Sequence, residues 1–139
     1  MQTGQPPPQR RIVFILSTPY AGSHFLSLQL GSHSRALHIG EIVNLGTAKS
    51  KNWHDNELSA KVLEGLGPVD LAHIHSAIFE RCDPGISLLV DTSKKVSWAE
   101  GCLAEKRFGK KFLHLIRDPR ALVAGIENLD HSADAQWFN

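Results

Sequence analysis

The chain has 139 residues, 42% of them apolar, which suits one globular domain with its own core. A formal net charge of +1 argues against a protein that coats nucleic acid, so any anion site should be local. The two cysteines, Cys82 and Cys102, form neither a disulfide framework nor a zinc-site spacing. We expect both to be reduced structural thiols.

The two ends of the chain differ from its middle. Residues 1–10 are polar and proline-rich, which is typical of a disordered tail, so the domain is assigned to residues 11–139. The apolar run Ile12–Leu16 is too short to span a bilayer, and a cytoplasmic protein without a membrane span is expected. Trp137 and Phe138 have nothing after them to pack against, which predicts a fold that is incomplete at its carboxyl terminus.

The first elements are two strands separated by a helix. The β-rich run Ile12–Leu16 predicts a strand buried on both faces. A buried helix over Ser23–Leu30 follows, and Gly31 is placed to end it. Ala36–Ile39 predicts a short second strand, and residues 44–52 predict a loop.

Two further helices are predicted in the middle of the chain. Asp55 could cap the first, and Gly67-Pro68 should stop it. Their apolar faces are formed by Leu58, Val62, Leu63 and Leu66 in the first helix and by Leu71, Ile74 and Ile78 in the second.

The last third predicts two more strands. A turn at Asp83–Gly85 precedes a buried strand over Ile86–Val90, and a helix then continues as far as Gly109. A second buried strand is expected over Phe112–Ile116, followed by a helix through Ala121–Leu129. Apolar strands that alternate with helices predict an α/β domain with a parallel sheet.

Polar residues gather after three of these strands, in Thr18–His24, Asp91–Lys94 and Arg117–Arg120. In an open parallel sheet, ligands bind beyond the carboxyl ends of the strands. This convergence is the main functional signal, and it argues against a purely structural protein.

The first of these loops has the composition of an anion-binding turn. Gly22 would let the backbone approach an anion closely, and the first N–H groups of the helix would point at the ligand. The alternative is an ordinary strand-to-helix turn capped by Ser23. The loop lacks the lysine of a Walker A sequence, which disfavours ATP hydrolysis.

Four charged residues lie near these strand ends, and three of them have both a functional and a structural interpretation. Arg117 could fork onto a phosphate, or pair with Asp118 or another carboxylate at the rim of the sheet. Lys94 could neutralise a transferring group or be a surface lysine. Glu41 could be a general base or a solvated loop residue, whereas a structural role is favoured for Asp91.

The histidines do not form a catalytic or metal-binding cluster in the sequence. His114 alternates within a predicted buried strand and is expected to be a core residue. His73 and His75 are two residues apart on a helix, so they should point to different faces.

Four motifs together resemble the sulfotransferase family, over nearly the whole chain but only the amino-terminal half of a typical family domain. They are Tyr20-Ala21-Gly22-Ser23-His24-Phe25, Leu30-Gly31-Ser32-His33 with Gly40-Glu41, Asp91-Thr92-Ser93-Lys94, and His114-Leu115-Ile116-Arg117-Asp118-Pro119-Arg120-Ala121-Leu122. The last is the most specific. The resemblance implies a three-layer fold like that of the P-loop nucleotide kinases and the co-substrate 3′-phosphoadenosine-5′-phosphosulfate (PAPS).

The resemblance also implies roles for individual residues. The Tyr20–Phe25 loop would hold the 5′-phosphosulfate and Arg117 the 3′-phosphate. Glu41 would be the base toward a hydroxyl or amine acceptor, and Lys94 would stabilise the charge on the sulfuryl group. The implied transfer needs no metal, because side chains and amides meet the charge of the donor. Whether the protein is a homo-oligomer is left open.

Three positions depart from the family pattern. Tyr20 replaces the basic residue at the head of the loop, His24 replaces its second hydroxyl, and Gly125 replaces a serine that contacts the 3′-phosphate. Two alternatives therefore stay open: a truncated, non-catalytic module that binds the bisphosphate product, and, less favoured, a small-molecule kinase.

Overall fold

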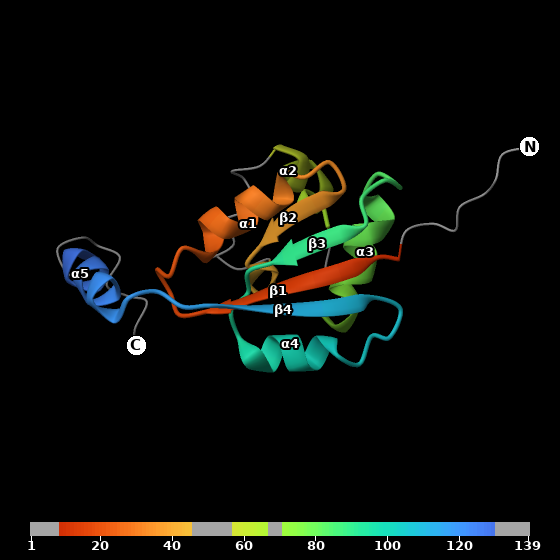
Figure 1. Ribbon diagram of the computed structural model, residues 1–139. Coiled ribbons are helices and arrows are strands. Elements are labelled where there is room, and N and C mark those ends of the chain that lie inside the picture. Colours follow the sequence, from red (N-terminus) through yellow and green to blue (C-terminus); the bar gives the residue numbers. More distant parts are fainter. Residues whose placement is uncertain (1–8, 46–56, 67–70, 130–139) are drawn as a thin grey trace, which may run out of the picture.

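The computed structural model describes residues 9–45, 57–66 and 71–129. Its elements alternate between strands and helices (Figure 1). In chain order they are β1 (Arg11–Ser17), α1 (Ser23–Gly31), β2 (Ala36–Gly40), the 3-10 turn η1 (Ile42–Asn44), α2 (Glu57–Leu63), the 3-10 turn η2 (Leu71–His73), α3 (Ile74–Arg81), β3 (Leu88–Asp91), α4 (Val96–Cys102), β4 (Gly109–Leu115) and α5 (Pro119–Leu129).

The four strands form one parallel sheet in the order β2-β3-β1-β4, which confirms the predicted α/β class. Val13 of β1 lies beside Val90 of β3 and Lys111 of β4. A register shift between His38 and Gly40 interrupts the pairing of β2 with β3. All four strands therefore send their carboxyl ends to the same edge of the sheet.

Helices cover both faces of the sheet because successive side chains of a strand point in opposite directions. His38 of β2 faces α1, where its ring nitrogen Nδ1 is hydrogen-bonded to Ser27. Phe14 of β1 faces α3, and its ring lies 5.6 Å from that of His75. Trp98 of α4 bonds Asp91, which pairs with Phe14 in the sheet, so α4 lies on the α3 side.

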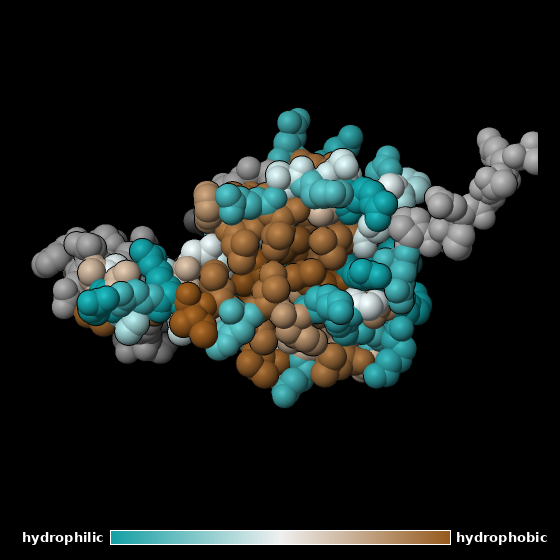
Figure 2. Space-filling model, in the orientation of Figure 1, coloured by the Kyte–Doolittle hydropathy of each residue, from teal (hydrophilic) through white to brown (hydrophobic). Residues whose placement is uncertain are grey.

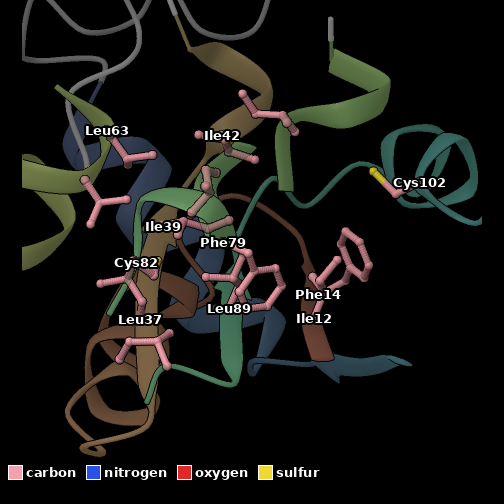
Figure 3. Packing of buried hydrophobic residues seen from close by; sticks show 14 of the residues in the cluster. Ile12, Phe14, Leu37, Ile39, Ile42, Leu63, Phe79, Cys82, Leu89 and Cys102 are labelled. Carbon is pink, nitrogen blue, oxygen red and sulfur yellow. The ribbon is translucent and has the colours of Figure 1, made fainter. Parts of the chain in front are cut away.

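The main core lies between the sheet and the helices on the α3 side (Figure 3). It contains Ile12 and Phe14 from β1, Leu89 from β3, and Ile74, Ile78 and Phe79 from α3, with Cys82 and Cys102 at its ends. Both cysteines are free and buried, as the sequence analysis predicted.

The helix that was expected to reach Gly109 is shorter. It ends at Cys102, and Gly109 instead begins β4, where it pairs with Arg11. Pairing with β1 supplies backbone hydrogen bonds that an extended α4 would have to forgo. At the other boundary, Ile86 precedes β3 rather than beginning it, because its N–H donates 2.9 Å to the Asp83 carbonyl and closes the predicted turn.

The prediction of a buried fourth strand was wrong. Phe112, Leu113 and Ile116 are 47%, 40% and 77% exposed, and His114 is exposed rather than a core residue. β4 is the edge strand of the described sheet, and α5 extends beyond it instead of covering it (Figure 1). Leu113 pairs with Ile15, which places it on the α1 side, where Figure 2 shows an apolar surface.

Several sequence-based expectations concern residues outside the described ranges. These are the tail before Gln9, the loop after Leu45, the cap at Asp55, the stop at Gly67-Pro68, and the terminal Trp137 and Phe138. Within the described ranges, each helix is too short or too polar to cross a membrane.

Candidate functional site

The strand order has its topological switch point at the carboxyl ends of β1 and β3. These strands are neighbours, but the chain leaves β1 toward β2 on one side and leaves β3 toward β4 on the other. Ligands in open α/β sheets bind where neighbouring connections diverge in this way. The loops that follow these two strands are residues 18–22 and 92–95, which overlap two of the three polar segments singled out in the sequence.

The first loop has an unusual backbone. Tyr20 has φ 62° and Gly22 has φ 96°, both in the left-handed region. Gly22 is the N-cap of α1 and makes no side-chain cap bond, and Ser23 is the first helical residue. The capping role considered for Ser23 is therefore absent, and the start of α1 directs its first N–H groups out of the helix end.

The side chains of this loop have different environments. Ala21 and Ser23 are buried, Tyr20 is 39% exposed and Phe25 is 66% exposed. The hydroxyl of Ser17, at the end of β1, is buried and has no hydrogen-bond partner among the described residues. The loop thus offers its backbone, rather than a cationic side chain, to a ligand.

Glu41 and Lys94 are brought together although they are 53 positions apart in the chain. Lys94 Nζ donates to Glu41 Oε1, and Asn44 Nδ2 donates to Glu41 Oε2 at 3.1 Å. The two charged side chains are only about one-fifth exposed. Gly40 and Lys94 both have φ 64°, so the ion pair is held by two left-handed residues at the ends of β2 and β3.

Asp91 is the buried anchor of the loop that carries Lys94. It is fully buried, and its Oδ2 accepts hydrogen bonds from His75 Nε2 at 2.8 Å and Trp98 Nε1 at 2.9 Å. Its Oδ1 accepts from the N–H of Ser93 at 2.8 Å. The structural role favoured for Asp91 is confirmed, because its carboxylate connects α3 and α4 to this loop.

The same loop is bonded to the end of β2. The N–H of Thr92 donates to the Gly40 carbonyl at 2.9 Å, and the N–H of Val43 donates to Ser93 Oγ at 3.1 Å. The backbone on both sides of the Glu41–Lys94 ion pair is therefore fixed from the sheet outward.

Arg117 reaches the first loop from the end of β4. Its Nη1 donates to the Tyr20 carbonyl at 2.8 Å, while its side chain remains exposed. Pairing of Arg117 with Asp118 does not occur, because Arg120 binds Asp118 through Nη2 at 2.6 Å. Hydrogen bonds from Arg120 lower the pKa of Asp118, and Asp118 raises the pKa of Arg120.

Gly125 is the predicted site residue that stays apart from the others in the fold. It lies in α5, which extends beyond the sheet (Figure 1), and a Cβ placed on it would meet no atom within 4 Å. The other predicted positions are all at the carboxyl edge of the sheet. No cluster of His, Cys, Asp and Glu that could hold a metal occurs within residues 9–45, 57–66 and 71–129.

Sequence reasoning missed two groups of buried polar residues behind the site. One is His75 with Trp98, whose bonds to Asp91 depend on how α3 and α4 pack. The other is His38, which bonds Ser27 and whose ring lies 5.2 Å from that of His24. A polar residue in each of two apolar segments, β2 and α1, was the only available signal.

No protein-family model, curated protein or solved structure matches this chain. The resemblance to sulfotransferases consequently rests on the four motifs alone.

Proposed function

We propose that the carboxyl edge of the sheet binds a nucleotide of the PAPS type and supports sulfuryl transfer to a hydroxyl or amine. The observation that carries the proposal is that the segments following all four strands lie at the same edge of the sheet. These are the Tyr20–Phe25 loop after β1, Glu41 after β2, Lys94 after β3 and Arg117 after β4. The parallel order β2-β3-β1-β4, with helices on both faces, is consistent with a P-loop-like fold.

Each group has a role in this proposal. The first-turn N–H groups of α1 hold the 5′-phosphate, as helix N-termini do for anions generally. Arg117 holds the Tyr20 carbonyl through Nη1, which leaves Nε and Nη2 for the 3′-phosphate. One arginine thereby fixes the loop and reads the nucleotide.

The Glu41–Lys94 ion pair must open before transfer. An arriving phosphosulfate offers Lys94 a stronger anionic partner, so Glu41 is released to accept the proton of the acceptor. The acceptor oxygen or nitrogen then bonds to sulfur while the bond from sulfur to the bridging phosphate oxygen breaks. Lys94 stabilises the charge left on that oxygen, and the product nucleotide is adenosine 3′,5′-bisphosphate.

The second candidate is a module that binds this bisphosphate without transferring a group. The uncharged Tyr20 and the separate position of Gly125 favour it, because each removes a donor contact that the family pattern has. A small-molecule kinase is less favoured because the loop has no lysine to meet the phosphates of ATP.

Melting temperatures test the nucleotide part of the proposal. Adenosine 3′,5′-bisphosphate should raise the melting temperature more than ADP does, because Arg117 reads the 3′-phosphate. The variant Arg117→Ala should remove the difference, whereas Arg120→Ala, whose side chain binds Asp118, should keep it. Equal shifts with both nucleotides, or none, would reject the proposal.

Transfer is tested with labelled PAPS and a panel of hydroxyl and amine acceptors. The transferase hypothesis expects labelled product that Glu41→Gln and Lys94→Gln both abolish while bisphosphate binding persists. Nucleotide binding without transfer to any acceptor would instead support the binding module, and transfer that survives Glu41→Gln would reject Glu41 as base.

A further inference from the structure

A groove lined by basic side chains lies at the opposite, amino edge of the sheet. A groove of about 440 Å³ is formed where β1, β2 and β3 begin, with Arg11, Ala36 and Leu88 as the first residues of these strands. His33 and Arg35, in the turn between α1 and β2, also line it, and its remaining lining residues are Gln9 and Ser87. The groove is separated from the Tyr20–Phe25 loop by the length of the strands.

The two arginines of this groove differ from the other arginines in the partners of their guanidinium groups. Arg81, Arg107, Arg117 and Arg120 donate side-chain hydrogen bonds to protein acceptors, and Arg10 stacks on Phe79. The guanidinium groups of Arg11 and Arg35 have no such partner among the described residues, and no acidic side chain lines the groove.

His33 adds a hydrogen-bond donor of fixed tautomer. Its Nδ1 accepts from the N–H of Arg35 at 3.1 Å, so the ring proton is on Nε2. Two carbonyls of the last turn of α1, on Gln29 and Leu30, already accept from the N–H groups of Ser32 and His33. These bonds satisfy part of the negative end of the helix, which reduces its repulsion of an anion.

The backbone under the groove is held in place. The Arg35 carbonyl accepts from the N–H groups of both Ser87 and Leu88. The stem of Arg11 lies against Gly109, where an added Cβ would come within 3.2 Å of Arg11 Cγ. A larger residue at position 109 would displace Arg11, so the glycine preserves its position beside the groove.

We propose that this groove binds a phosphate ester. The two guanidinium groups and the imidazole N–H suit a dianionic phosphate, because guanidinium forks match phosphate oxygens in geometry and charge. Ala36 and Leu88 supply an apolar floor for the organic part of the ester. The site is independent of the sulfuryl-transfer proposal and lies at the other edge of the sheet.

The test follows backbone amide NMR shifts of the full chain during titration with phenyl phosphate and, separately, inorganic phosphate at physiological salt. Saturable shifts should appear at Arg11, Arg35 and Leu88, with tighter binding of phenyl phosphate than of inorganic phosphate. The double variant Arg11→Gln/Arg35→Gln should weaken binding by about tenfold to a hundredfold, since each lost charged hydrogen bond accounts for roughly tenfold and two are removed.

Two control variants separate this site from other basic groups. Arg107→Gln removes an arginine that is paired with Glu105 away from the groove, and Arg120→Gln removes one that is paired with Asp118; both should keep the phenyl phosphate shifts at Arg11, Arg35 and Leu88. Retained binding in the double variant, or shifts confined to Tyr20–Phe25, would overturn the proposal. Equal affinity for the two phosphates would reject an ester as the ligand.

Discussion

Replacing Asp91 with asparagine should destabilise the protein by leaving one buried donor without a partner. The carboxylate accepts from His75 and Trp98 through Oδ2 and from the Ser93 N–H through Oδ1. Asparagine has a single oxygen, so its NH₂ group must face one side of this arrangement.

Both orientations of the amide lose an interaction. If the NH₂ group faces Ser93, the Ser93 N–H loses its acceptor. If it faces α3 and α4, His75 can accept from it by moving its own proton to Nδ1, but the indole of Trp98 can only donate. An unsatisfied buried donor costs about 1–3 kcal/mol, and we expect a loss of that size in the free energy of unfolding.

Urea unfolding followed by circular dichroism measures this loss. The matched control is Asp83→Asn, at an exposed turn where one oxygen accepts from the Gly85 N–H at 2.7 Å and asparagine keeps that oxygen. The control should change stability by less than about 0.5 kcal/mol. If Asp91→Asn behaves like the control, the buried carboxylate does not hold the Lys94 loop as inferred.

Two further predictions concern packing and thiol chemistry. Gly31→Ala places a Cβ 2.7 Å from the Cβ of His38 and should lower stability by about 1–3 kcal/mol, whereas Gly101→Ala, with open space, should raise it by roughly 0.5 kcal/mol; thermal unfolding showing the same sign for both would contradict this. Burial raises the pKa of Cys82 and Cys102 from 9.0 to about 11, so both should react slowly with a disulfide reagent at pH 8 and rapidly once urea unfolds the chain. Both thiols have a higher pKa in the folded chain than in the unfolded chain. Their contribution to the free energy of unfolding is therefore complete below about pH 9 and is lost as pH rises toward 11. Urea midpoints that do not change with pH across that range would contradict this prediction.

Local sequence patterns were sufficient to predict the bounds of the first strand and the first helix. β1 and α1 were predicted within one residue at each end, because a continuous apolar run and a glycine-led turn are local signals. The exposure of β4 could not be predicted in the same way. Phe112–Leu115 has the composition of a central strand, and its exposure depends on its edge position and on the direction that α5 takes after Leu115.

The site was predictable to the extent that topology alone determines it. A parallel sheet brings Glu41 and Lys94 to one edge, but their ion pair also requires β2 to lie beside β3, an order that the sequence does not specify. The bonds of His75 and Trp98 to Asp91 depend on the packing of two helices, which sequence spacing does not specify.

The backbone strain at the carboxyl edge connects the buried network with the proposed ligand. Tyr20 and Lys94 are the non-glycine residues of the described chain with positive φ, and they lie in the loops that follow the neighbouring strands β1 and β3. Such conformations cost of order 1–3 kcal/mol each and persist only where neighbouring contacts enforce them. Arg117 supplies such a contact at the Tyr20 carbonyl, and Asp91 supplies it beside Lys94 through the Ser93 N–H. Backbone strain that is maintained at one edge of the sheet is better explained by ligand binding at that edge than by a contribution to stability. Since Asp91 helps to maintain this strain, Asp91→Asn should also weaken anion binding at the carboxyl edge.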